Sequence, residues 1–341
     1  MANLNDTDLL IIDNAKSVSL KKTLELMYGF KIIKTHNPSY ISLTSRKATL
    51  ETNMGKFFLK EKPLYCSDTL SMQRSSFFQD FCSKKIHFIP KIIRTKDNNF
   101  YFEFENRKYF LQEYINGRLF NGSKKDISRM LDIINELNIA GKKFLDHTNL
   151  PKDTTKKFNS FEIATLIPTL DKFIKNEKDR FTFNKIQTTF DNLKNEYNLA
   201  GNSSFVMAHS DCILFNFIFS GDKTYLIDFD NTKVLPRIHD IAEFFVSATS
   251  LNYITDINNL KRPVLTKPNK IFLKIILSFY KKKFNFTKKE ILLFPIIVDV
   301  VWLWTLCLSI LKEDYRLEDI ERILEIINDK TNREETIKIL S

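Results

Sequence analysis

The spacing of apolar positions changes several times along the chain and predicts two structurally different parts. The segment "LKKTLELMYGF" carries apolar residues at helical spacing and ends near a glycine, which predicts a helix over residues 4 to 29. Short β-branched and aromatic runs follow, broken by Asn-Pro-Ser and Asn-Met-Gly turns, and predict a small antiparallel sheet ending in "KFFLKEK". A helix over roughly 67 to 84 and two strands split at Asn106 complete the first part.

Beyond residue 124 the spacing is mainly helical. One apolar stripe with a period of 3.6 residues predicts a long helix and consists of Ile127, Met130, Leu131, Ile134 and Leu137. Two further helices are predicted over 160 to 200, and the chain is helical again over 269 to 341. Between these regions, short apolar runs around 205 to 230 are typical of buried strands.

The block of predicted strands carries polar residues in apolar surroundings. The stretch "FVMAHSDCILFNFIFSGDKTYLIDFDNTKV" places Asp211, Asn216, Asp228 and Asp230 between runs of Val, Met, Ile, Leu and Phe. Buried carboxylates are costly unless they are paired or bind a metal. These acids are therefore either satisfied structural groups at loop corners or ligands that converge on a cation.

Composition narrows the classes of protein. A chain of 341 residues with 43% hydrophobic residues, 7 Gly and 9 Pro is globular without long linkers. The net charge of +11 comes from lysines spread along the chain, so solvated faces are favoured over nucleic-acid binding, and a basic cleft would suit a nucleotide. Four scattered Cys predict no zinc site and fit a cytoplasmic protein without a signal peptide. The apolar stretch 291 to 311 contains Asp299 and is interpreted as a buried core helix, with no membrane span expected.

The polar residues of the strand block match a known motif set in order and spacing. His209-Ser210-Asp211, Asn216, "IDFD" (227 to 230) and "DIA" (240 to 242) resemble the aminoglycoside phosphotransferase and choline kinase superfamily. The form of this block looks like the spore-coat-associated and homoserine-kinase-like branches. The resemblance implies an α+β, two-lobed, protein-kinase-like fold, with a small antiparallel-sheet N-lobe at 1–115 and a large, mainly helical C-lobe at 116–341.

The resemblance also implies roles for single residues. Asp211 is expected to accept the proton of a substrate hydroxyl, and Asn216 and Asp228 to bind Mg²⁺. His209 and Asp240 are expected to support the loop through hydrogen bonds.

In the first lobe, the resemblance implies a lysine that pairs with phosphate and a hinge that binds adenine. Lys60 matches this lysine, and the preceding Phe58-Leu59 pair favours it, although Lys62 faces the same side of the strand. A plain edge-strand lysine is the structural alternative. Backbone groups of the hinge are expected at Gln112, Glu113, Tyr114 and Ile115.

Two departures from the family pattern bear on activity. The helix after Lys60 is expected to supply a Glu that pairs with it, but residues 67 to 85 contain no Glu, and Gln73 or Arg74 stands at that position. The phosphate-covering loop also lacks a glycine-rich run. Asp230 stays open between a second metal contact and a solvated acid beside the site.

These observations favour an enzyme of the kinase type. The function expected from the resemblance is an ATP- or GTP- and Mg²⁺-dependent phosphotransferase acting on a hydroxyl of a small molecule. The partners expected are a nucleotide and a small hydroxylated substrate, with no nucleic acid. The alternative, which the missing Glu favours, is a catalytically weak kinase-fold protein with a structural or binding role. Region 235 to 265 has no Ala-Pro-Glu-like segment, which argues against protein substrates.

Overall fold

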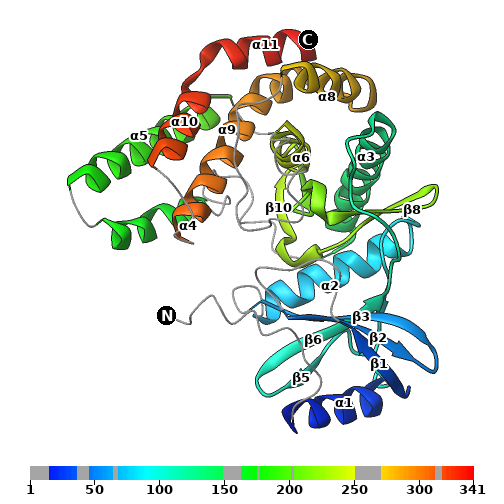
Figure 1. The fold of residues 1–341 in the computed structure, drawn as a ribbon. Coiled ribbons are helices and arrows are strands. Elements are labelled where there is room, and N and C mark those ends of the chain that lie inside the picture. Colours follow the sequence, from blue (N-terminus) through cyan, green and yellow to red (C-terminus); the bar gives the residue numbers. More distant parts are fainter. Residues whose placement is uncertain are drawn as a thin grey trace. The chain divides into compact units, whose positions relative to one another are not determined.

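The chain forms two compact units in the computed structural model. The structure describes residues 15–36, 46–63, 68–148, 163–174, 177–200, 203–249, 270–311 and 317–341. Unit 1 consists of Met1–Arg118 and Ile218–Thr232, and unit 2 of Leu119–Phe217 and Lys233–Ser341 (Figure 1). The acidic hairpin of the strand block, which the sequence assigns to the second lobe, therefore packs with the first part of the chain.

Unit 1 is built on an antiparallel sheet in the order β1-β2-β3-β6-β4, with β5 paired to β6. Two helices accompany this sheet, and Gly29 follows the first of them with a positive φ of 79°. Of the predicted helix over 4 to 29, residues 4 to 14 lie outside the described part. The elements are α1 (Ala15–Tyr28), β1 (Ile32–His36), β2 (Lys47–Thr52), β3 (Gly55–Glu61), α2 (Thr69–Ser83), β4 (Ile92–Ile93), β5 (Phe102–Phe104) and β6 (Arg107–Glu113).

The alternation of side chains along β3 decides what each face of the sheet carries. Leu59 packs in an apolar cluster with Leu24 of α1 and Leu111 of β6, so this face of the sheet is covered by α1. Lys60 and Lys62 point to the opposite face, which α2 covers (Figure 1). Both lysines are buried, with 2% and 3% of their surface exposed.

The acidic hairpin is tied to α2 and to the segment that follows it. It consists of β8 (Phe217–Ser220), β9 (Lys223–Leu226) and a 3₁₀ turn, η5 (Phe229–Asn231). The Leu226 amide donates to the Phe88 carbonyl at 3.0 Å, and the Phe229 ring packs edge-on against Phe78 of α2. This packing places the acids on either side of Phe229 against the lysine-bearing face of the sheet.

Unit 2 is mainly helical and is built around α9 (Lys288–Leu311). This helix packs against α5, α6, α10 and α11, and its buried residues include Trp302, Phe294 and Asp299. It is long and apolar enough to span a bilayer, but most of it is buried, as expected for a core helix. The other elements are α3 (Lys124–His147), α4 (Ile163–Leu166), η3 (Ile167–Phe173), α5 (Glu177–Ala200), β7 (Phe205–Ala208), η4 (Leu214–Asn216), β10 (Lys233–Pro236), α6 (His239–Thr249), α8 (Lys270–Lys283), α10 (Leu317–Asn328) and α11 (Lys330–Leu340).

A short antiparallel ribbon, β7 with β10, carries the polar loop of unit 2. Helix α3 approaches it so closely that a Cβ at Gly141 would lie 2.2 Å from the Met207 carbonyl oxygen. Only glycine fits this contact. The predicted fold class, an antiparallel sheet followed by a mainly helical part, is confirmed.

Glu290, in the first turn of α9, links the ribbon to the core helix. Arg237, just after β10, donates to its two oxygens at 2.6 Å each, and Ser203, just before β7, donates at 2.9 Å. The Thr287 amide adds a hydrogen bond at 3.0 Å. Burial by itself would raise the pKa of Glu290, but the bonds from Arg237, Thr287 and Ser203 outweigh it and lower the pKa to about 2.

This shift gives a prediction for stability against pH. Because the folded-state pKa lies below the ordinary value of 4.5, the stabilisation by Glu290 is complete above about pH 4.5 and is lost as the pH falls toward 2. Glu290→Gln should lower the free energy of unfolding by about 3 kcal/mol at pH 7. Urea denaturation at pH 7, 5 and 3.5 measures the difference from wild type, which should shrink at the lowest pH. An equal loss at pH 7 and 3.5 would contradict the assignment.

Candidate active site

The loop after β7 is fixed by one buried carboxylate. Asp240, in the first turn of α6, accepts hydrogen bonds from the backbone amides of His209 at 2.9 Å and Ser210 at 2.8 Å. Ser210 has a φ of 59°, a left-handed conformation that costs a residue with a Cβ about 1 kcal/mol or more. Burial raises the pKa of Asp240 to about 6, although the two amides act in the opposite direction. The charge-assisted bonds from two successive amides hold the loop in this strained form.

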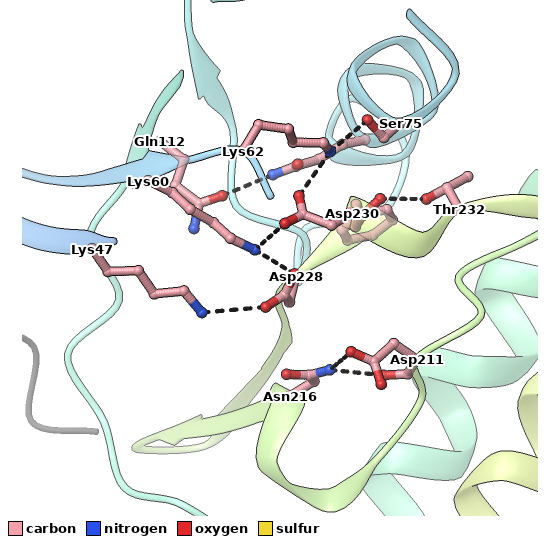
Figure 2. Close-up of polar contacts among 12 residues, drawn as sticks. Lys47, Lys60, Lys62, Ser75, Gln112, Asp211, Asn216, Asp228, Asp230 and Thr232 are labelled. Carbon is pink, nitrogen blue, oxygen red and sulfur yellow. Dashed lines mark hydrogen bonds and ion pairs between the residues drawn. The ribbon is translucent and has the colours of Figure 1, made fainter. Parts of the chain in front are cut away.

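Asp211 and Asn216 meet within this loop. The Asn216 side-chain nitrogen donates to the Asp211 carbonyl at 2.8 Å and to the Asp211 carboxylate at 2.9 Å (Figure 2). This bonding turns the Asn216 amide so that its Oδ1 has no hydrogen bond among the described residues. The loop therefore presents one half-buried carboxylate and one neutral amide oxygen.

Other buried polar groups lie beneath the loop. Glu243, three residues after Asp240 on α6, accepts a hydrogen bond from the Cys212 amide at 3.0 Å. Burial, with the neighbouring acids Asp240 and Asp211, raises the pKa of Glu243 well above its ordinary value, whereas burial and Lys233 lower the pKa of His239 to about 3. Glu243 was not predicted, although its i+3 spacing puts it on the same helix face as Asp240 and is a signal that could have identified it.

In unit 1, two acids that flank Phe229 meet Lys60 of β3 and Lys62, which follows the strand. Lys60 pairs with Asp228 and also with Asp230, whose Oδ2 lies 2.6 Å away. Lys62 donates to the other oxygen of Asp230 at 2.7 Å (Figure 2). Burial would lower the pKa of Lys60, but the charges and hydrogen bonds of Asp228 and Asp230 raise it. Lys60, which the sequence favours, and Lys62, its alternative, are thus both buried and both paired with this acidic turn.

Lys47 is a third lysine of the cluster and was missed in the sequence. Its Nζ lies 3.3 Å from Asp228 Oδ2, and burial followed by repulsion from Lys60 lowers its pKa. The feature that could have identified Lys47 is the register of the β2–β3 pair, in which Lys47 stands directly opposite Lys60. Three lysines face two aspartates, so the cluster carries a surplus positive charge.

Asp228 and Asp230 differ in their suitability as metal ligands. The Asp228 side chain is 19% exposed and the residue is left-handed, with a φ of 71°, whereas the Asp230 side chain is 4% exposed. Mg²⁺ takes hard oxygen ligands and keeps several water molecules, which need space. Asp228 of unit 1 fits such an ion in kind, and so, taken by itself, does the Asn216 Oδ1 of unit 2. Asp230 does not, because both its oxygens are enclosed by ammonium groups, and it is not the solvated acid considered above.

The predicted hinge lies at the end of β6. The Gln112 side chain is buried and accepts a hydrogen bond from Gln79 of α2 at 3.1 Å. The Glu113 backbone amide donates a hydrogen bond to the Lys91 carbonyl at 3.0 Å. Tyr114 and Ile115 follow the strand outside its ladder, so their backbone groups and the Glu113 carbonyl are the candidates for contact with adenine.

Comparisons with known proteins agree with this architecture. Residues 137–259 match the model of the ecdysteroid kinase-like family. An amicoumacin kinase, solved with AMP-PNP, Ca²⁺ and Ami, has a TM-score of 0.68 at 13% identity, and the match covers 93% of this chain and 94% of the other. No curated protein sequence matches significantly.

Two eukaryotic parasite kinases have similar folds. An ethanolamine kinase of Plasmodium vivax has a TM-score of 0.60 at 16% identity, covering 94% of this chain and 89% of its own. A choline kinase of Cryptosporidium parvum has a TM-score of 0.59 at 15% identity, covering 91% of each chain. The chain has the protein-kinase-like fold of the aminoglycoside phosphotransferase and choline kinase superfamily.

The departure from the superfamily pattern in α2 is visible in the structure. Within Thr69–Ser83, all of which is described, Asp80 is the one acidic residue. It pairs with Lys84 at 2.6 Å and Arg94 at 3.1 Å and not with the lysines of the sheet. The helix residue that reaches this cluster is Ser75, whose hydroxyl accepts from Lys62 at 2.9 Å.

Asp240→Asn is expected to loosen the loop. The asparagine offers one acceptor and turns an NH₂ group toward the second amide, leaving it buried and unpaired. The free energy of unfolding should fall by about 2–4 kcal/mol, and the His209 and Ser210 amides should exchange faster with solvent. Asp146→Asn, at an exposed position of α3, is the control and should change stability by less than about 0.5 kcal/mol. Equal stability of the two variants would contradict the role of Asp240.

Proposed function

We propose that the protein is an ATP- and Mg²⁺-dependent phosphotransferase that acts on a hydroxyl group of a small molecule. The observation that carries the proposal is the pairing of Lys60 with Asp228 in unit 1. A phosphate-binding cation and a metal-binding carboxylate at one place are the groups that phosphoryl transfer needs for its nucleotide. The carboxylate that would accept the proton of the acceptor hydroxyl is that of Asp211.

The charges of the lysine cluster support a nucleotide. Lys47, Lys60 and Lys62 exceed Asp228 and Asp230 by one positive charge, and an anionic ligand would balance it. Lys47 and Lys60 each pair with one oxygen of Asp228, the carboxylate that we propose as the metal ligand. Their ammonium groups would contact phosphate oxygens once Asp228 is engaged by Mg²⁺. Mg²⁺, when bound, would neutralise and align those oxygens.

The groups of unit 2 would act on the acceptor. Asp211 would accept a hydrogen bond from the substrate hydroxyl and take its proton as the oxygen attacks the γ-phosphorus, while the bond from this phosphorus to the β,γ-bridging oxygen breaks and ADP leaves. Asn216 would keep the Asp211 carboxylate in orientation through its Nδ2, and its Oδ1 would be available as a metal ligand. Ser210 and His209 would keep the loop in place through Asp240.

The acceptor class is supported by the structural neighbours. Three of them are named as kinases of amicoumacin, ethanolamine and choline. A small hydroxylated molecule is therefore the acceptor we propose, and the net charge of +11 argues against polycationic aminoglycosides. The substrate-binding regions expected from the resemblance, 150 to 200 and 243 to 310, include residues outside the described part.

One observation favours the alternative of a catalytically weak kinase-fold protein. Helix α2 brings no carboxylate to Lys60, because Asp80 is paired elsewhere. A binding or structural protein would tolerate that loss.

Nucleotide binding gives the first functional test. ATP with Mg²⁺ should raise the melting temperature, because a ligand at 100 times its Kd stabilises the native state by about 2.7 kcal/mol. Asp228→Asn should abolish the Mg²⁺-dependent part of the shift, and Asn tolerates the left-handed φ at this position. Asp222→Asn, at an exposed position of the same hairpin, is the control. A shift that is independent of Mg²⁺ and equal in all three proteins would overturn the metal assignment.

Catalysis separates the enzyme from the alternative. Asp211→Asn should reduce kcat by about 10²- to 10⁴-fold, the usual contribution of a general base, with little change in nucleotide affinity. ADP production measures turnover in a screen of choline, ethanolamine, other amino alcohols, sugars, homoserine, nucleosides and aminocyclitols. No turnover in wild type with any acceptor, together with background ATP hydrolysis unchanged in Asp211→Asn, would favour the binding protein.

A further inference from the structure

Lys60 is shared between two carboxylates with different surroundings. Asp228 is partly exposed and is the residue proposed above to bind Mg²⁺, whereas Asp230 is buried. A metal bound by Asp228 would compete with Lys60 for its oxygens. Lys60 would then keep one carboxylate, Asp230, at 2.6 Å.

Asp230 is enclosed by ion pairs with two lysines. Its Oδ2 accepts from Lys60 and its Oδ1 from Lys62, and its side chain is 4% exposed. A buried carboxylate between two ammonium groups is fixed in position, because its removal would leave Lys62 buried without the carboxylate it pairs with.

The same contacts connect Asp230 to helix α2. Lys62 donates to Ser75 Oγ at 2.9 Å, and Ser75 donates in turn to the Met72 carbonyl of its own helix at 3.3 Å. Beside Asp230, the Phe229 ring packs on Phe78 of α2. A chain of contacts thus runs from α2 through Lys62 and Asp230 to Lys60 (Figure 2).

We propose that Asp230 is the positioning residue of Lys60, in place of a carboxylate on α2, and that Lys62 and Ser75 couple it to that helix. The inference rests on the proposed function, because Lys60 needs a position only if it binds phosphate. The absence of a helix Glu then leaves the site intact, since its charge is supplied by the acidic turn.

Binding of a nucleotide with and without Mg²⁺ separates positioning from a merely structural role. With Mg²⁺ on Asp228, Lys60 depends on Asp230 alone, whereas without the metal Asp228 also holds it. Asp230→Asn should therefore weaken binding of a non-hydrolysable ATP analogue at least tenfold with Mg²⁺ and less than threefold without it. Isothermal titration calorimetry measures both affinities, and circular dichroism checks the fold.

A control and a second variant keep the test decisive. Asp80→Asn removes the one carboxylate of α2 and should leave both affinities within twofold of wild type. Lys62→Met/Asp230→Asn removes both charges of a buried pair, so it should fold even where Asp230→Asn does not, and it should lose the same tenfold with Mg²⁺. Ser75 Oγ lies 2.9 Å from Lys62 Nζ, so adding Ser75→Glu to this double variant returns a carboxylate from α2 to the place of the removed Lys62–Asp230 pair and should recover at least fivefold of the lost affinity.

The outcomes distinguish this inference from the proposed function. A wild type that binds no Mg²⁺-nucleotide would refute the proposed function and the inference with it. A wild type that binds, with variants of Asp230 within twofold of it or equally weakened with and without Mg²⁺, would refute the inference alone. So would a loss of affinity in Asp80→Asn equal to that in Asp230→Asn, or no recovery with Ser75→Glu.

Discussion

Burying a lysine ammonium group costs several kcal/mol, which a carboxylate or another anion at hydrogen-bonding distance can offset. In unit 1, a pair of lysines and a pair of aspartates with the same two-residue spacing meet this constraint. Lys60 and Lys62 stand two residues apart on one face of the sheet, and Asp228 and Asp230 stand two residues apart on one turn. Phe229 between the acids points to Phe78 of α2, so apolar packing and ion pairing fix the same register. The hairpin that contains these acids must therefore pack with the sheet, although a hundred residues of chain separate it from β6.

Unit 2 uses buried carboxylates in another way. Asp240 binds backbone amides and stabilises a left-handed residue that the chain would otherwise avoid, and Glu290 binds a guanidinium group, a hydroxyl and an amide that come from three segments. Both acids lie at the start of helices, α6 and α9, where the dipole favours a negative charge. The loop that bears Asp211 is thus held by electrostatics at both ends of its ribbon, whereas the lysine cluster of unit 1 is held by pairs of side chains.

The sequence was sufficient where the signal is local. Periodicity predicted α2, α3 and the strands of the sheet. Motif spacing predicts Asp211, Asn216 and Asp228 as one set, and the structure pairs the first two of them. Alternation along "KFFLKEK" also indicates that Lys60 and Lys62 share a face, and the Phe58-Leu59 pair favours Lys60; in the structure both lysines are buried and paired. What the sequence could not give is the identity of partners separated by many residues. Asp230 remained undecided because its burial depends on the packing of α2, and Lys47 was overlooked because its role depends on the β2–β3 register.

Helix α2 supplies no carboxylate to Lys60, and the composition of the lysine cluster explains how the site can lack one. A protein that binds no anion gains nothing from three lysines buried against two aspartates, since apolar residues of similar volume often give equal or greater stability. The surplus charge of Lys47, Lys60 and Lys62 is therefore a cost to folding that a bound polyanion would offset. Asp230 keeps that surplus to one charge and holds Lys60 in place, while Asp228 stays accessible at the edge of the cluster. An accessible acid beside an enclosed one would suit the metal-dependent nucleotide site proposed above, because the first can bind a metal while the second holds Lys60 and Lys62.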